Sequence, residues 1–365
     1  MKYSDLYLTY KGLAPKRVPH WENMSNPDAE SLITGIDYYK YPRSCRLEMK
    51  RLYPEILLNI PDDDTPVPRP EEIFGDKSSV LLDNGEVAVR WGDGATRHWN
   101  HGSRFQTVED VMSFSPLEQG NFEGMVVAED FDYSDESKLY DMFRSRYPAQ
   151  WGDKAPEGST DFAFFYNTMF MWPLLTFGWE LFMLTCLEDE FERIMNEFAE
   201  LSRRVFQVFA RLPVNLIICH DDIATTRGPI CSPEWMNKYI YPRYEEFWDI
   251  VKKEGKQVVF VADGNLNELV DNIITCGASG IKSEPYTDYK AIAKRHKDCV
   301  IAGEGDNRVL MTNDSCQIKA MVDSMVETAK MCGGYFMSVG NHIPWDVPPE
   351  AVKLYLEYSA EKAFR

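Results

Sequence analysis

The sequence has no long uninterrupted apolar run, no excess of positive charge and no closely spaced cysteine pair. Its 365 residues include 58 Asp and Glu against 39 Lys and Arg, which gives a net charge of -19. A nucleic acid or an anionic membrane surface binds a basic face, so this balance disfavours both as partners. It also disfavours a substrate that carries many carboxylates.

The first residues, MKYSDLYLTYKG, contain no apolar core, so we expect no signal peptide. The most apolar stretch, Phe162–Cys186, is interrupted by Asn167, Pro173 and Glu180. It therefore predicts a buried strand and helix rather than a membrane span. We expect a cytoplasmic protein without a membrane partner.

The eight cysteines show no C-x-x-C spacing, and most of them lie in apolar positions. This pattern is typical of buried thiols in a reducing compartment. A metal site that includes Cys276 and Cys316 stays an alternative, although both residues are predicted on helices, away from the strand ends. The sequence has no low-complexity segment.

One stretch, Val214–Arg243, shows how the chain is organised. It opens with the apolar run Val214–Cys219, which is typical of a strand buried on both faces, and this run ends at His220–Asp222. Ser232 and Pro233 then predict a helix start, because Ser caps helices and Pro is favoured at the first helical position. In parallel α/β folds the end of the strand is where chemistry is done.

The same order of strand, polar residues and helix recurs four more times, and each predicted strand ends in acids, His or Asn. These strands are Lys256–Ala262, Gly280–Ser283, Cys299–Ala302 and Tyr335–Val339. Strands that alternate with helices imply a parallel sheet with right-handed crossovers. Five such units fill more than half of a (β/α)8 barrel, so we predict an α/β fold of the TIM barrel type.

The N-terminal part follows a different pattern. Helices are predicted at Asp28–Tyr39 and Arg46–Leu58, and Asn84-Gly85 between two β-rich runs predicts a hairpin. We predict a single domain (residues 1–365), in which residues 1–115 form an N-terminal elaboration that includes the hairpin and residues 116–365 form the barrel.

Further elements are expected between the hairpin and the repeated units. Gly124–Ala128 and Asp161–Tyr166 are predicted as early barrel strands, and Leu187–Ala210 as a helix with one apolar face. The segment Gly303–Asp306 is predicted to lead into one long helix that ends near Cys332.

Four segments carry a resemblance to a known family. They are the D-D…SPEWMNKYIYPRY segment that begins at Asp221, the V-x-D-G-N turn at Val261–Asn265, the G-x-G-D at Gly303–Asp306 and the run GGYFMSVGNHIPWDVPPE at Gly333–Glu350. In this order they resemble the uroporphyrinogen decarboxylase superfamily, roughly from Leu187 to the C-terminus. The resemblance implies a (β/α)8 barrel, in agreement with the repeated units.

The superfamily has two main branches. True decarboxylases carry an Arg-rich N-terminal segment that binds substrate carboxylates, where this chain has RVPHWENMSN from Arg17. Corrinoid-dependent methyltransferases move a methyl group between a small molecule and the cobalt of a separate corrinoid protein. The R-W-G at Arg90–Gly92 looks more like the O-demethylase members. The resemblance therefore implies an enzyme that demethylates a small methylated substrate, with an aryl methyl ether as the leading candidate.

Relatives in this superfamily hold zinc through H-x-C on one strand end and a Cys near the last strand. Here the His and Cys of H-x-C are replaced by Val261 and Asp263, and the last Cys is replaced by Asn341, with His342 beside it. Glu284 falls where a Glu ligand would be. A set of Asp263, Glu284 and His342 could still hold Zn²⁺ as a Lewis acid, which would help an ether oxygen to leave. The alternative for Asp263 is ordinary turn chemistry.

Other polar residues at the predicted strand ends complete the candidate site. His220, Asp222 and Glu304 are the catalytic candidates, and His220 and Asp222 are expected to orient the substrate or to donate a proton. The candidates for substrate binding are Asp221, Arg227 and Asn341.

Two other functions stay open. A decarboxylase would need cationic groups at the mouth of the barrel, and Arg227 and Arg308 are the obvious candidates. A non-catalytic barrel that only binds a corrinoid protein or a ligand is the second alternative. The oligomeric state is also open, with a homodimer among the alternatives.

Overall fold

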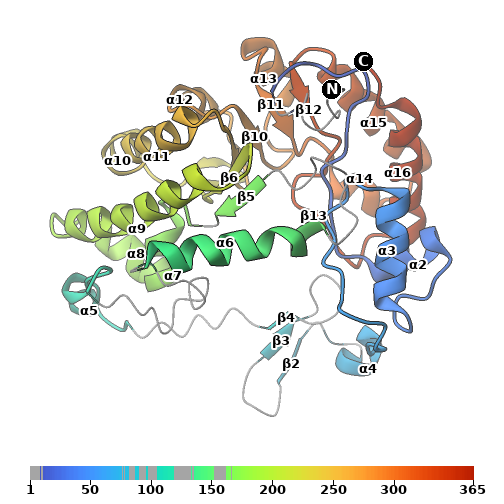
Figure 1. Ribbon diagram of the computed structural model, residues 1–365, viewed down its shortest axis with the longest axis horizontal. Helices are drawn as coiled ribbons and strands as arrows, with labels where there is room; N and C mark the ends of the chain where they lie inside the picture. Colours follow the sequence, from blue (N-terminus) through green and yellow to red (C-terminus); the bar gives the residue numbers. More distant parts are fainter. Residues whose placement is uncertain are drawn as a thin grey trace. The chain divides into compact units, whose positions relative to one another are not determined.

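The computed structural model describes residues 9, 11–75, 77, 79–81, 87–89, 96–97, 105–118, 133, 135–151, 162–165 and 167–365 (Figure 1). These residues group into two compact units. The first unit comprises Met1–His98, Pro148–Thr160 and Lys282–Arg365, and the second comprises Trp99–Tyr147 and Asp161–Ile281. The prediction of a single domain, with an elaboration at residues 1–115 and a barrel at residues 116–365, stays a prediction.

The second unit is built on three parallel strands, β5 (Phe162–Phe165), β6 (Leu216–His220) and β9 (Gln257–Val261). Phe162 pairs with Leu216, and Leu216 pairs with Gln257. All five residues of β6 are buried, as expected for an apolar strand covered on both faces. The predicted strands are confirmed, with the difference that His220 is the last residue of β6.

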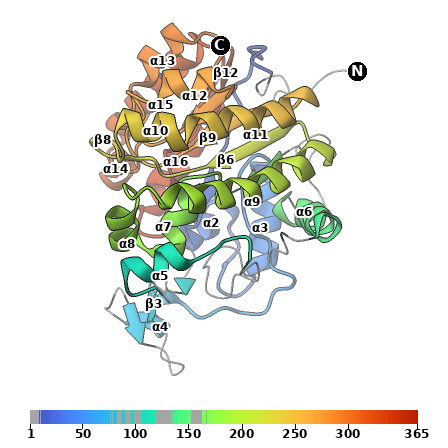
Figure 2. The ribbon, with the colours of Figure 1, turned by 90° about the vertical axis from the view of Figure 1, so that its left-hand side faces the viewer.

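The helices of the second unit are α5 (Val108–Ser113), α7 (Met171–Phe177), α8 (Trp179–Thr185), α9 (Phe191–Arg211), α10 (Pro233–Tyr239), α11 (Tyr241–Lys253) and α12 (Val270–Thr275). Helix α6 (Glu136–Trp151) begins in the second unit, and its last residues belong to the first. The side chain of Ser232 accepts a hydrogen bond from the backbone N–H of Trp235, which confirms the predicted start of α10. Helices α9 and α11 lie side by side (Figure 2), and the rings of Phe206 and Phe247 stack between them.

Two polar loops of the second unit follow directly from these strands. After β6 the chain forms a short hairpin of β7 (Ala224–Thr225) and β8 (Gly228–Pro229) before α10 begins. After β9 it forms the turn at residues 263–265. Both loops emerge at the carboxyl ends of parallel strands.

In the first unit, parallel strands pair the N-terminal segment with the C-terminal one. Strand β1 (Asn23–Met24) pairs with β13 (His342–Ile343), and β11 (Val300–Ala302) pairs with β12 (Gly334–Tyr335). His20 forms a further parallel bridge to Met337. The residues around β1, which the sequence analysis assigned to an elaboration, therefore pair as a strand. Strand β10 (Gly280–Lys282) spans the boundary between the two units.

The helices of the first unit are α2 (Pro27–Thr34), α3 (Pro42–Leu52), α4 (Pro70–Phe74), α13 (Tyr289–Arg295), α14 (Asn307–Met311), α15 (Ser315–Ala329) and α16 (Pro349–Lys362). The prediction of one helix from Asp306 to Cys332 is wrong. The chain breaks after α14, where Asn313 takes a positive φ of 51°, and Asp314 caps a new helix.

The predicted helices at Asp28–Tyr39 and Arg46–Leu58 exist, but each begins and ends earlier. Asn26 caps α2, Gly35 ends it in the left-handed conformation, and Pro42 opens α3. Strands β2 (Ser79–Leu81), β3 (Val87–Val89) and β4 (Thr96–Arg97) form a small antiparallel sheet, which confirms the hairpin. Its turn at Asn84-Gly85, and the predicted strand Gly124–Ala128, lie outside the described residues. No helix in the described part of the chain is long and apolar enough to cross a membrane.

Candidate active-site residues at the strand ends

The three ionisable residues after β6 have different environments. Asp221 is completely buried, and its carboxylate accepts hydrogen bonds from the backbone N–H groups of Met169 (2.6 Å), Phe170 (3.0 Å) and Met171 (2.8 Å). The hydroxyl of Tyr244 donates a fourth bond at 2.7 Å. This carboxylate therefore fixes the start of α7 to the end of β6 and to α11.

This environment gives Asp221 a structural role. A side chain with no exposed surface and four internal donors has no face left for a substrate, which argues against the substrate contact expected from the sequence. Burial raises the pKa of Asp221 to about 6, although the hydrogen bonds from Met171, Phe170 and Tyr244 oppose that rise.

His220 and Asp222 form a pair beside this anchor. The Nε2 atom of His220 lies 3.2 Å from Oδ1 of Asp222, and the same oxygen accepts a hydrogen bond from the backbone N–H of Asp263 at 2.8 Å. The side chain of Asp222 is 26% exposed and that of His220 9%. The pair therefore stands at the boundary between the interior and the surface of the second unit.

Charge determines the protonation of this pair. Burial alone would lower the pKa of His220, but the hydrogen bond to Asp222 and the charges of Asp222, Asp221 and Asp263 outweigh it and raise the pKa. Burial also acts to raise the pKa of Asp222, but His220 and the amide of Asp263 hold it below its usual range. The raised pKa of His220 and the lowered pKa of Asp222 favour a protonated imidazole opposite an ionised carboxylate.

An aromatic ring lies beside His220. Phe164 on β5 is 37% exposed, while the other three residues of that strand are buried, and its ring centroid is 6.2 Å from that of His220. The sequence analysis did not select Phe164, because its apolar neighbours make the whole segment resemble a core strand. The exposed ring gives the His220–Asp222 pair a flat apolar surface.

The turn after β9 contains Asp263, for which the sequence left two interpretations: a metal ligand or an ordinary turn residue. Gly264 takes a φ of 90°, and a Cβ there would stand 2.7 Å from the backbone oxygen of Thr225, so glycine is required. Asn265 donates its backbone N–H to the same oxygen at 2.9 Å. The turn therefore packs on the β7–β8 hairpin, and Asp263 contributes its amide to Asp222 and its charge to His220. Arg227 lies exposed at the tip of that hairpin.

In the first unit, His342 begins β13 and contacts its neighbour Asn341, with 3.0 Å between Nδ1 and the amide oxygen. The side chain of Asn307 donates to the backbone oxygen of His342 at 2.8 Å. Burial and the positive charge of Lys282 lower the pKa of His342, so its imidazole is neutral at pH 7.

Lys282 is a site candidate that the sequence analysis missed. It is 3% exposed, and its ammonium group lies 5.1 Å from the centroid of the Trp21 ring. The signal was present in the sequence, because a lysine inside the short apolar strand Gly280–Lys282 has to be buried next to compensating groups.

Glu304 lies at the end of β11 and is tied into the fold. Its carboxylate accepts hydrogen bonds from the hydroxyls of Thr328 on α15 (2.9 Å) and of Tyr335 on β12 (2.6 Å). Burial raises its pKa, although the two hydroxyls oppose the rise. The preceding Gly303 takes a φ of 96°, and a Cβ there would collide with the backbone oxygen of Ser283. Close packing against Ser283 therefore accounts for this glycine.

The proposed zinc ligands are divided between the units: Asp263 belongs to the second, and Glu284 and His342 belong to the first. Among the residues that the structure describes, no three His, Cys, Asp or Glu side chains are grouped so that they could hold a metal ion. The positive charge of Lys282 near His342 also opposes a divalent cation there. The proposed ligands are therefore not grouped as a metal site among the described residues, and zinc binding stays a prediction that metal analysis would test.

Comparisons with known proteins agree with the fold. Residues 180–361 match the model of the uroporphyrinogen decarboxylase family. A methyltransferase from Methanosarcina mazei is similar in structure, with a TM-score of 0.57 and 15% sequence identity, over 98% of this chain and 97% of that chain. No curated protein matches the sequence. The predicted α/β fold of the (β/α)8 barrel type is thereby confirmed.

Proposed function

Because the chain belongs to the uroporphyrinogen decarboxylase superfamily, we propose that it transfers a methyl group from a small methylated compound to the cobalt of a corrinoid protein. An aryl methyl ether is the substrate class that we propose. The observation that carries the proposal is the His220–Asp222 pair with the exposed ring of Phe164 beside it. The structural similarity to a methyltransferase supports the barrel fold that the proposal assumes.

The chemistry of ether cleavage explains why this pair fits. In the proposed reaction the bond between the methyl carbon and the ether oxygen breaks, and the methyl group passes to the reduced cobalt of the partner. The oxygen keeps the bonding electron pair and would leave as a poor leaving group unless a proton reaches it. His220 is the group that we assign to deliver this proton, because its contact with Asp222 raises the pKa of the imidazole and so favours the protonated form.

The neighbouring residues have supporting roles in this proposal. Asp222 orients the imidazole through Nε2, and the backbone amide of Asp263 fixes the carboxylate of Asp222. The exposed face of Phe164 suits a flat aromatic ring next to His220. No step uses zinc.

The test is methyl transfer to cob(I)alamin, which stands in for the corrinoid protein, measured by the absorbance of methylcobalamin. We expect turnover with methoxybenzenes and a loss of about 10²–10⁴-fold in the His220→Gln variant. His296→Gln is the matched control, because this histidine follows α13, outside the candidate site. A nitro-substituted methoxybenzene, whose phenolate leaves without a proton, should restore much of the rate. Equal loss with both substrates would contradict proton donation by His220.

Decarboxylation is the second candidate, because the matching family model is that of uroporphyrinogen decarboxylase. It requires cationic groups for substrate carboxylates, but Arg308 is already paired with Asp306, with 2.8 Å between Nη2 and Oδ2. Release of CO2 from uroporphyrinogen would establish this function in place of methyl transfer. Binding of a corrinoid protein without any turnover would instead establish the binding-only alternative.

A further inference from the structure

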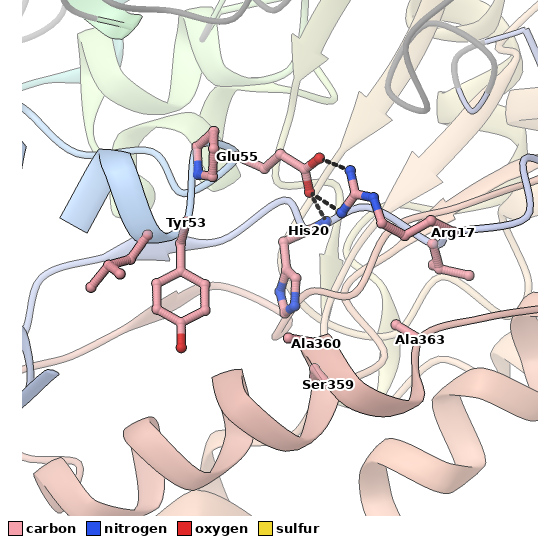
Figure 3. Close-up of a pocket in the computed structure, with 10 residues that line it drawn as sticks. Arg17, His20, Tyr53, Glu55, Ser359, Ala360 and Ala363 are labelled. Atoms are coloured by element: carbon pink, nitrogen blue, oxygen red, sulfur yellow. Dashed lines mark hydrogen bonds and ion pairs between the residues drawn. The ribbon is translucent and has the colours of Figure 1, made fainter. Parts of the chain in front are cut away.

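The first unit contains a cavity of about 270 Å³ that none of the candidate catalytic, metal or substrate residues lines (Figure 3). Three segments form its walls: the stretch that leads into β1, the loop after α3 and the last turn of α16. Its polar lining residues are Arg17, His20, Tyr53, Glu55 and Ser359. All of them belong to the first unit, so the cavity is formed within one compact body.

Two polar side chains of this cavity are buried without hydrogen-bond partners among the described residues. They are His20, with both ring nitrogens unpartnered at 7% exposure, and Ser359, with its hydroxyl unpartnered at 0% exposure. In Figure 3 the ring of His20 points toward Ser359 and Ala360 on α16. A buried polar atom left without a partner is costly, so this arrangement is typical of a site whose missing partner is a bound molecule.

The charged groups around the cavity are already compensated. Arg17 donates two hydrogen bonds to the carboxylate of Glu55, which also accepts the backbone N–H of His20 at 2.7 Å. Glu22 behind the ring accepts the backbone N–H of Val339 at 3.1 Å and the hydroxyl of Tyr355. Its carboxylate lies 3.9 Å from Nδ1 of His20, beyond hydrogen-bond distance.

This charge balance limits the charge that a ligand of the cavity can carry. An anion would meet the carboxylate of Glu55 and the carbonyl end of α16, which carries partial negative charge, while the guanidinium of Arg17 is already shared with Glu55. A cation would need a carboxylate that is free to pair, and the oxygens of Glu55 already have donors. The remaining walls are apolar, from Val18, Leu52, Pro54 and Ala363. A neutral, partly apolar molecule fits this environment.

We propose that this cavity is a second binding site, for a small neutral molecule with a hydroxyl group, such as an alcohol or a phenol. One hydroxyl placed between His20 and Ser359 donates to an imidazole nitrogen and accepts from the serine hydroxyl, so both buried groups gain a partner. The carbon skeleton then lies against the apolar walls. This site is independent of the proposed methyl transfer and does not rest on it.

The experiment is a titration with phenol, followed through the imidazole resonances of ¹⁵N-labelled protein. The signals of His20 are assigned by their loss in His20→Gln. We expect phenol to shift the resonances of His20 and to leave those of His296 unchanged. Benzoate and benzylammonium, which have the same ring with a negative or a positive charge, should bind at least about tenfold more weakly.

Ser359→Ala separates a binding site from an empty or water-filled void. Loss of the hydroxyl should weaken phenol binding by about five- to tenfold, whereas Ser324→Ala, on α15 and outside the lining, should leave it unchanged. No shift of His20 with phenol would overturn the proposal, as would equal binding of benzoate. Unchanged phenol affinity in Ser359→Ala would overturn it even if the variant His20→Gln failed to fold.

Discussion

The ends of β6 in the second unit and β11 in the first begin from the same sequence pattern, an apolar strand followed by acids. At the end of β6, His220 and Asp222 pair at the edge of the interior, next to an exposed aromatic ring. At the end of β11, Glu304 receives the hydroxyls of Thr328 and Tyr335 and joins a strand to a helix. A carboxylate at a strand end can therefore pair with a histidine near the surface or join elements of the fold, and this depends on the groups around it.

The same contrast occurs between adjacent residues. Asp221 and Asp222 are neighbours in the chain, yet Asp221 is completely buried and accepts four hydrogen bonds, whereas Asp222 is partly exposed and pairs with His220. Consecutive side chains after a strand point to opposite sides, so one acid faces the helix layer and the next can face solvent. The acid that anchors the fold and the acid that pairs with His220 are thus adjacent in the chain.

The largest effect is expected from Asp221→Ala. The substitution leaves three backbone N–H groups and the hydroxyl of Tyr244 without their acceptor, so we expect a loss of about 4–5 kcal/mol in the free energy of unfolding, measured by denaturant titration. Tyr244→Phe removes one of these bonds and should cost about 1 kcal/mol. A loss below about 1 kcal/mol in Asp221→Ala would show that the carboxylate is not an anchor.

The next effect concerns activity at the neighbouring residue. His220→Gln should lower kcat for an aryl methyl ether by about 10²–10⁴-fold while changing the free energy of unfolding by less than about 1 kcal/mol. The reason is that the imidazole bonds mainly to Asp222, at the edge of the interior. If His220→Gln lowered stability as strongly as activity, the pair of His220 and Asp222 would be part of the structural anchor, as Asp221 is.

Asp222→Asn should change the pH dependence rather than abolish the reaction. The folded pKa of His220 is raised, so its proton is present below that pKa and is lost as the pH rises through it. Removal of the Asp222 charge lowers this pKa, and the alkaline limb of the pH–rate profile should move to lower pH, with about a tenfold loss of rate above the new limb. An unchanged alkaline limb would mean that another group titrates.

The smallest effect is expected from Glu304→Gln. The amide can still accept from one hydroxyl, so we expect a loss of about 1 kcal/mol in the free energy of unfolding and a rate of methyl transfer within about twofold of the wild type. Thr328→Val, which removes one of the donors, is the matched control for stability. A tenfold or larger loss of kcat at unchanged stability would restore the catalytic role expected from the sequence.

Much of the fold could be predicted from local patterns. The buried apolar runs predicted β6 and β9, the Ser-Pro pair predicted the start of α10, and the Asn-Gly turn predicted the hairpin of β2 and β3. Local rules failed where helix ends depend on single caps. Asn313 divides the last long helix, and Gly35 ends α2 before the predicted boundary.

The candidate site could be predicted only in part. The identity of His220 and Asp222 came from their place after a strand, but their pairing distance and the exposure of Phe164 depend on how neighbouring strands are aligned. Lys282 and Trp21 are far apart in the sequence, and only folding brings the ammonium group over the ring. The cavity near His20 likewise needs three segments that no local pattern connects.

The sequence by itself determined the alternation of strands and helices, the polar strand ends and the acidic character of the chain, because these follow from periodicity and composition. Only the tertiary structure decided which acid is an anchor and which is a partner for histidine. The physical reason is burial: donors enclose the carboxylate of Asp221 in the interior, whereas that of Asp222 is partly exposed and pairs with His220.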